Sequence, residues 1–174
     1  MTLRVAIIIL AVLLGAAPAL AEWQDATETG PGGKKIVMQR TPAKGAISKS
    51  GHDVTATLYL RCDNPYNDPV RYRSSDFWSA FVLFSEPVGS VQAPTRFSFD
   101  GGQASESRFM LNPRGTAMFF TQQEDEDNDF IKRLAKSNTL QINPTLTWAG
   151  TPTITFDTTG AAAALQQIPC SKKF

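Results

Sequence analysis

The residues of this chain that could most readily do chemistry are the acids of the run EDEDND at 124–129. Clustered carboxylates bind hard cations such as calcium. An EF-hand loop starting at the first aspartate of the run would need Gly at its sixth position and Glu at its twelfth, where this sequence has Phe130 and Lys136. We therefore expect a solvated loop that caps the following helix rather than a metal site. The weaker alternative is a cation site with the ligands Asp125, Asp127 and Asp129.

Nucleophilic catalysis has little support in this sequence. It needs a base beside the nucleophile and a third group to orient that base, and the single histidine, His52, lies in the polar turn KSGHD. Neither G-x-S-x-G nor S-x-x-K occurs, and GPGGKK lacks the spacing of a phosphate-binding loop. We expect His52 at the surface, no cofactor and no enzyme activity. A hydrolase of cell-wall or glycan material remains the alternative, because the separation of two carboxylates cannot be derived from sequence.

The two cysteines, Cys62 and Cys170, are best explained as a disulfide. Residues 1–21 have the features of an export signal: Arg4 precedes the apolar run VAIIILAVLLGAA, and the tripeptide ALA offers a cleavage site before residue 22. Export brings the chain into an oxidising compartment, where such pairs form bonds. A metal site would need more ligands, and neither cysteine lies in a C-x-x-C pattern, so a metal site and a reactive thiol are the lesser alternatives.

The expected organisation is a signal peptide at 1–21, a polar lead-in or edge strand at 22–50, and a single domain at 51–174. The apolar run is short for a membrane span and no basic stop-transfer cluster follows it, so we expect no stable membrane anchor. Cleavage removes Arg4 and no acid, so 17 Lys and Arg become 16, against 16 Asp and Glu. This neutral balance argues against nucleic-acid binding. The expected location is the periplasm or the exterior of a Gram-negative cell.

Strand patterns dominate the chain from Asp53 onward. In DVTATLYLRC, apolar residues alternate with polar ones and put Cys62 on the apolar face, whereas SAFVLF is apolar on both faces. SRFML and TAMFFTQ flank the turn NPRG as a hairpin. Strands at this spacing, joined by turns, predict an antiparallel sandwich or barrel. Its expected core aromatics are Trp78, Phe81, Phe84, Phe97, Phe99, Phe119 and Phe120.

Two short helices are expected among these strands. In DNDFIKRLAKSN, apolar residues stand four apart, and Asn128 or Asp129 could cap the helix. Near the carboxyl end, Gly160 permits a turn and residues 161–167 are strong helix formers. The expected fold class is therefore mainly β, an antiparallel β-sandwich with two short helices, closed by one disulfide.

Aromatic residues near turns are the best candidates for an exposed contact surface, since turns lie at the surface and aromatic side chains anchor many interfaces. These candidates are Tyr66, Tyr72 and Phe77.

Four segments together resemble a known family. They are LYLRC, VRYR with Trp78 nearby, FIKRLAKSNTLQINP and ITFDTTGAAAALQQIPC, and they span most of Asp53 to Cys170. In this order they resemble the VasI group of exported proteins found in type VI secretion loci, and allied exported proteins of unassigned role. The resemblance implies an exported, non-catalytic accessory protein closed by one disulfide. Its partner would be a protein, such as a component of the envelope or of the secretion system, and there are no catalytic residues to carry over.

Overall fold

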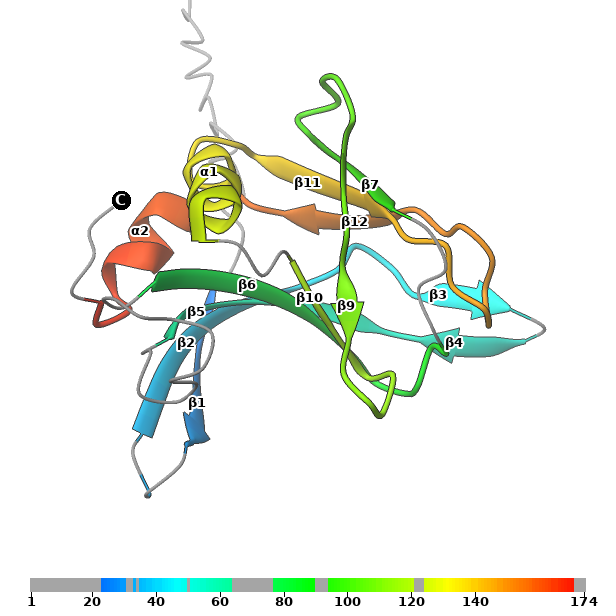
Figure 1. Cartoon of the computed structure of the whole chain (residues 1–174), viewed down its shortest axis with the longest axis horizontal. Helices are drawn as coiled ribbons and strands as arrows, with labels where there is room; N and C mark the ends of the chain where they lie inside the picture. Colours follow the sequence, from blue (N-terminus) through cyan, green and yellow to red (C-terminus); the bar gives the residue numbers. More distant parts are fainter. Residues whose placement is uncertain are drawn as a thin grey trace, which may run out of the picture.

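The computed structural model describes residues 23–30, 33, 35–49, 51–63, 77–89, 94–120 and 124–170 of the 174-residue chain (Figure 1). The expected export signal at 1–21 lies outside these residues. Within them, no helix has the length and hydropathy of a membrane span. The described chain forms antiparallel sheets in a sandwich, with short helices at one end, and this confirms the predicted fold class (Figure 1).

The larger sheet has six strands in the described part of the chain, in the order β1-β2-β5-β6-β10-β9. All neighbours in it are antiparallel. Strands β9 and β10 form the predicted hairpin, whose turn is closed by a hydrogen bond from the Gly115 N–H to the Asn112 carbonyl. The strands are β1 (Gln24–Thr29), β2 (Lys35–Pro42), β5 (Ala56–Asp63), β6 (Phe77–Phe84), β9 (Met110–Leu111) and β10 (Ala117–Phe119).

The smaller sheet has four antiparallel strands among the described residues, in the order β12-β11-β7-β8. A separate hairpin, formed by β3 and β4, precedes β5 in the chain. The strands of the smaller sheet are β7 (Thr95–Phe99), β8 (Ser105–Ser107), β11 (Thr139–Asn143) and β12 (Ile154–Asp157), and those of the hairpin are β3 (Ile47–Lys49) and β4 (His52–Val54).

The two sheets meet where β2 ends. Ala43, directly after β2, forms a β-bridge with Phe156 of β12, and the Lys44 N–H donates to the Thr155 carbonyl at 2.7 Å. The segment at 22–50, interpreted from sequence as a lead-in or an edge strand, therefore supplies the edge strand β1, the second strand β2 and this junction.

The hydrophobic core lies between the two sheets. Leu58 and Leu60 of β5 and Val82 of β6 are fully buried in it, as are Leu140 and Phe156 of the smaller sheet. Successive side chains of a strand point to opposite faces, so these residues are alternate members of their strands. The predicted apolar face of β5 is the face that meets the core.

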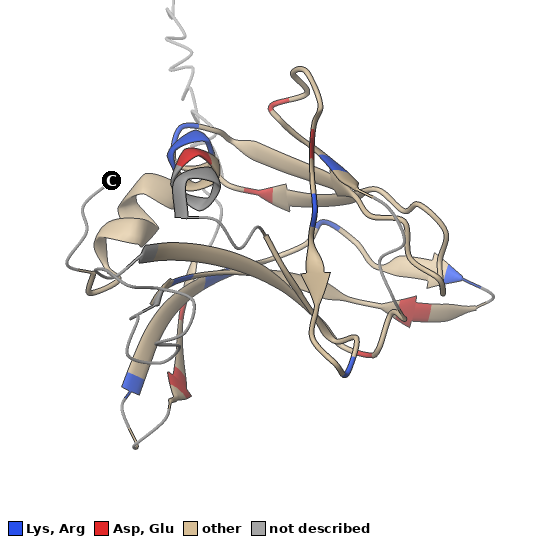
Figure 2. Ribbon diagram, viewed as in Figure 1, with Lys and Arg blue, Asp and Glu red and all other residues tan. Residues whose placement is uncertain are grey.

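Helix α1 (Glu124–Leu134) begins earlier than its sequence pattern predicted. Asn128 and Asp129 lie inside the helix, so their predicted role as caps is wrong, and so is the expected loop at 124–129. Acids favour the first turn of a helix because of its dipole, which explains why the acidic run is helical. The expected apolar stripe is confirmed by buried Phe130, and the basic residues of the last turn appear blue on α1 in Figure 2.

Helix α2 (Ala161–Gln166) follows β12 through Gly160, whose φ of 81° is in the left-handed region that glycine adopts without strain. Leu165 and Ile168 are buried in the main core, as their spacing predicted. The chain then reaches Cys170. This short helix places the carboxyl-terminal cysteine against the larger sheet.

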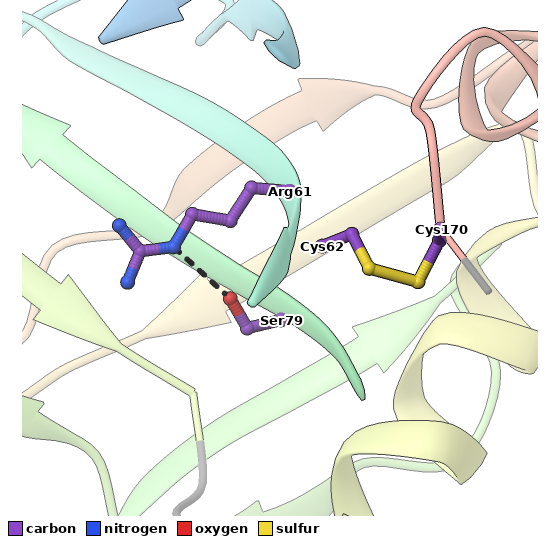
Figure 3. The surroundings of a disulfide bond; sticks show 4 residues. All are labelled: Arg61, Cys62, Ser79 and Cys170. Carbon is purple, nitrogen blue, oxygen red and sulfur yellow. Dashed lines mark hydrogen bonds between the residues drawn. A yellow bond between two sulfur atoms is a disulfide. The ribbon is translucent and has the colours of Figure 1, made fainter. Parts of the chain in front are cut away.

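The predicted disulfide between Cys62 and Cys170 is confirmed (Figure 3). It joins residues 108 positions apart in the chain, with 5.5 Å between their Cα atoms. Cys62 lies opposite Trp78 in the register of β5 and β6, and both cysteines pack against the core. The bond therefore ties an inner strand of the larger sheet to the segment that follows α2.

Removing this bond should destabilise the chain without changing its fold. Because the disulfide closes a long loop, the variant Cys62→Ala/Cys170→Ala should lose about 4 kcal/mol of unfolding free energy. Urea denaturation followed by circular dichroism measures this loss. Equal stability of the oxidised wild type and the double variant would contradict it.

Candidate functional site

The outward face of the larger sheet is unusually apolar. Strand pairing places Tyr59, Phe81 and Phe119 side by side on the face opposite the main core. A sheet that packs on one face usually presents polar residues on the other. Together with Met38 and Arg61 on the same face, these residues form a second cluster, which we call the outer aromatic face.

The three rings form a stacked row across β5, β6 and β10. The ring centroids of Tyr59 and Phe81 are 5.0 Å apart with planes 7° from parallel, and those of Phe81 and Phe119 are 5.4 Å apart at 30°. Cross-strand aromatic pairs of this kind stabilise a sheet by about 0.5–1 kcal/mol each. The row is therefore a rigid feature of the sheet.

Arg61 places a cation over this row. Its guanidinium carbon lies 5.1 Å from the centroid of Phe81 and 5.9 Å from that of Phe119. Its Nε donates to the Ser79 hydroxyl at 3.4 Å (Figure 3), and its Nη1 lies 3.9 Å from a carboxylate oxygen of Glu28. Figure 3 also shows Arg61 and Cys62 pointing to opposite sides of β5. One strand thus supplies the disulfide on its core side and the cation on its outer side.

The outer aromatic face becomes exposed at Leu83 of β6 and Met110 of β9. Leu83, two residues beyond Phe81, is 38% exposed, and Met110, opposite Phe119, is 44% exposed. Both are exposed large apolar side chains on the same face of the sheet. Leu83 and Met110 lie on either side of β10 and, with the aromatic row, form one apolar face. Contiguous apolar faces mark interaction sites more often than scattered single side chains do.

The contact residues predicted from sequence lie outside the side chains that the structure describes, so their part in a contact surface stays a prediction. Tyr66 and Tyr72 lie outside the described residues, and so does the side chain of Phe77, whose backbone is the first residue of β6. Phe81 and Phe119 were expected in the main core but belong to the outer aromatic face. The signal that could have found Phe81 is SAFVLF, whose apolar residues occupy both faces of the strand.

The candidate cation ligands lie on α1. Asp129 is exposed, whereas the side chains of Asp125 and Asp127 are outside the described part. No group of three or more His, Cys, Asp or Glu among the described residues could hold a metal ion. Cation binding by this run stays a prediction.

His52 is exposed, as predicted, and pairs with a carboxylate. Its Nε2 lies 2.6 Å from Oε2 of Glu86, and its ring meets the edge of Trp148 at a centroid distance of 5.9 Å. Lys49 donates to the Trp148 carbonyl. The contact with Glu86 ties the hairpin of β3 and β4 to a neighbouring loop.

Asp157 is an acid with a perturbed pKa, at the end of β12. Burial raises the pKa of its carboxyl group, but hydrogen bonds from Thr159 and the nearby Lys44 ammonium group outweigh burial and hold the pKa below its ordinary value of 3.8. The Thr159 N–H donates at 3.0 Å, and the Lys44 nitrogen is 3.3 Å away. A lowered pKa keeps this acid ionised, which suits a structural contact at the sheet junction.

Comparison with known proteins adds little. No family model matches the sequence, and no curated protein matches it. Among solved structures, invasion associated protein B from Bartonella henselae is similar at 14% sequence identity and a TM-score of 0.46, over 85% of this chain and 92% of that chain. Structural similarity at this sequence identity and TM-score does not indicate a function.

The lowered pKa of Asp157 predicts a pH-dependent contribution to stability. The stabilisation is present above the unfolded-state pKa and is lost as the pH falls through the lower folded-state pKa. Asp157→Asn should therefore cost about 1 kcal/mol at pH 7, and this difference from the wild type should shrink below about pH 4. Urea denaturation at several pH values measures it.

The control for this prediction is Glu106→Gln, which removes an ion pair with Arg96 that is exposed on both sides. Its cost should be smaller at every pH, because solvent screens exposed pairs. A cost for Asp157→Asn that stays constant from pH 7 to pH 2 would contradict the assignment.

Proposed function

We propose that this chain is an exported, non-catalytic protein that binds a protein partner through the outer aromatic face. The observation that carries the proposal is the stacked aromatic row beneath the Arg61 guanidinium, which continues into exposed Leu83 and Met110. Aromatic residues, Met and Arg are enriched in protein interfaces, and buried aromatic and Arg anchors supply much of the binding energy.

The rigidity of this face supports the proposal. Tyr59 and Phe81 are more than nine-tenths buried, and Arg61 is held by two rings, a hydroxyl and a carboxylate. Side chains that are ordered before binding lose little conformational entropy when a partner docks. Leu83 and Met110 are exposed, so a partner that covers them buries their apolar surface, and this burial favours binding.

The disulfide supports a location in the periplasm or outside the cell, because disulfides persist in oxidising compartments. The finer proposal is an accessory protein whose partner belongs to the envelope or to a type VI secretion system. This part rests on the resemblance of its LYLRC and ITFDTTGAAAALQQIPC elements to the VasI group.

The surroundings of Asp157 favour binding over glycan hydrolysis. A hydrolase needs two acids that face each other, one of them with a raised pKa. Asp157 lies beside the Lys44 ammonium group and has a lowered pKa. A cationic partner of this kind stabilises the ionised form of a carboxylate, whereas a general acid must hold its proton.

Photo-crosslinking in cells tests the proposal. A benzoylphenylalanine placed at position 83 or 110 should crosslink to the same protein from both positions, because both are exposed positions of the outer aromatic face. Position 106, exposed on β8 of the smaller sheet, is the control and should give no such adduct. Adducts are separated by gel electrophoresis and identified by mass spectrometry.

A second substitution makes this test quantitative. With the crosslinker at position 110, Leu83→Glu should reduce the adduct about tenfold, since it places a charge in an apolar contact. The melting temperature should change little, because Leu83 is partly exposed. The proposal fails if positions 83 and 110 give no common adduct, or if position 106 gives the same one.

A further inference from the structure

The open edges of the two sheets differ in how well they are protected. In the described part of the chain, β9 has two residues and β8 has three, which is too short for extensive pairing. The edge of β12 is covered where Ala43 bridges Phe156. Strand β1, in contrast, has six residues paired to β2 in an unbroken register, and five of the six are exposed.

Apart from its two acids, strand β1 lacks the usual devices that prevent an edge from pairing. Its sequence, QDATET, has no Pro, Lys or Gly, and its register with β2 has no bulge. In an antiparallel pair, alternate residues turn their N–H and C=O groups away from the neighbouring strand. No other strand of the described part of the chain pairs with the outer edge of β1, so this edge offers a row of backbone donors and acceptors.

This edge is held in place before any partner arrives. The indole N–H of Trp23 donates to the Thr159 carbonyl at 3.1 Å, which fixes the start of β1 against the segment before α2. Asp25 accepts a hydrogen bond from Gln39 at 2.5 Å, and Glu28 lies beside Arg61. A preorganised edge costs little entropy to pair.

We infer that the edge of β1 receives an extended segment of a partner protein as an added strand, with basic residues facing Asp25 and Glu28. Backbone hydrogen bonds would supply the affinity, as in other strand-addition complexes. The two acids are three residues apart and exposed, and they appear red along β1 in Figure 2. Opposite charges across a strand pair are favourable, so they select a segment with two basic residues at the same spacing.

A second copy of this chain fits the same edge poorly. If two β1 strands paired antiparallel with full overlap, position 25 of each would face position 28 of the other. Asp25 would then lie opposite Glu28 twice, and like charges directly opposite destabilise a strand pair. The same acids thus oppose self-pairing and favour a basic segment.

The probe is a fluorescein-labelled peptide, Thr-Lys-Val-Thr-Lys-Val, whose lysines face both acids in either strand direction. Fluorescence anisotropy with the full chain measures binding, and amide hydrogen exchange reports on Gln24–Thr29. We expect saturable binding and about tenfold slower exchange at alternate amides of β1, because an added strand pairs only outward-facing groups. A peptide N-methylated at alternate residues should bind about tenfold more weakly when the methylated edge is the pairing edge.

Matched variants separate the charge contribution from the backbone contribution. Asp25→Lys/Glu28→Lys should weaken binding of the lysine peptide about tenfold, whereas Glu106→Lys on β8 should not. Leu83→Glu on the outer aromatic face should also leave peptide binding unchanged. A failure of strand addition at β1 can therefore be distinguished from a failure of partner binding at the outer aromatic face. The inference is overturned by absence of binding at millimolar peptide, by binding that N-methylation and charge reversal leave unchanged, or by sedimentation showing dimers paired through β1.

Discussion

The disulfide between Cys62 and Cys170 fixes how the carboxyl-terminal segment meets the larger sheet, and much of the structure depends on it. Helix α2 has six residues, too few to be stable alone in water. Its position comes from burial of Leu165 and Ile168 and from the covalent bond that follows them. The hydrogen bond between Ser137 and Thr158 adds a buried polar contact between the end of α1 and the end of β12.

Strand β5 links this structural constraint to the proposed binding surface. Its even-numbered residues from 56 to 62 face the core, and its odd-numbered residues face outward. A shift of one residue in register would exchange the two faces and place Arg61 in the core. Cys62 and Arg61 are therefore specified together: the bond on one side of the strand holds the register that presents the cation on the other.

Local sequence patterns predicted the parts of the fold that depend on near neighbours. The alternation in DVTATLYLRC predicted the core face of β5. The disulfide was predicted on other grounds, the expected oxidising compartment and the even number of cysteines. The predicted start of α1 was wrong because the acidic run was interpreted as a capping loop, whereas it forms the first turns of the helix. The outer aromatic face was missed because it arises from the order β5-β6-β10, and pairing between distant strands cannot be derived from the period of one strand.

A covalent bond between Cys62 and Cys170 closes this sandwich. The most direct test is the mass of the chain, isolated without reductant, after alkylation under denaturing conditions with and without prior reduction. We expect no alkylated cysteine before reduction and two after it, because Cys62 and Cys170 are bonded to each other. Two alkylated cysteines without reduction would contradict the claim.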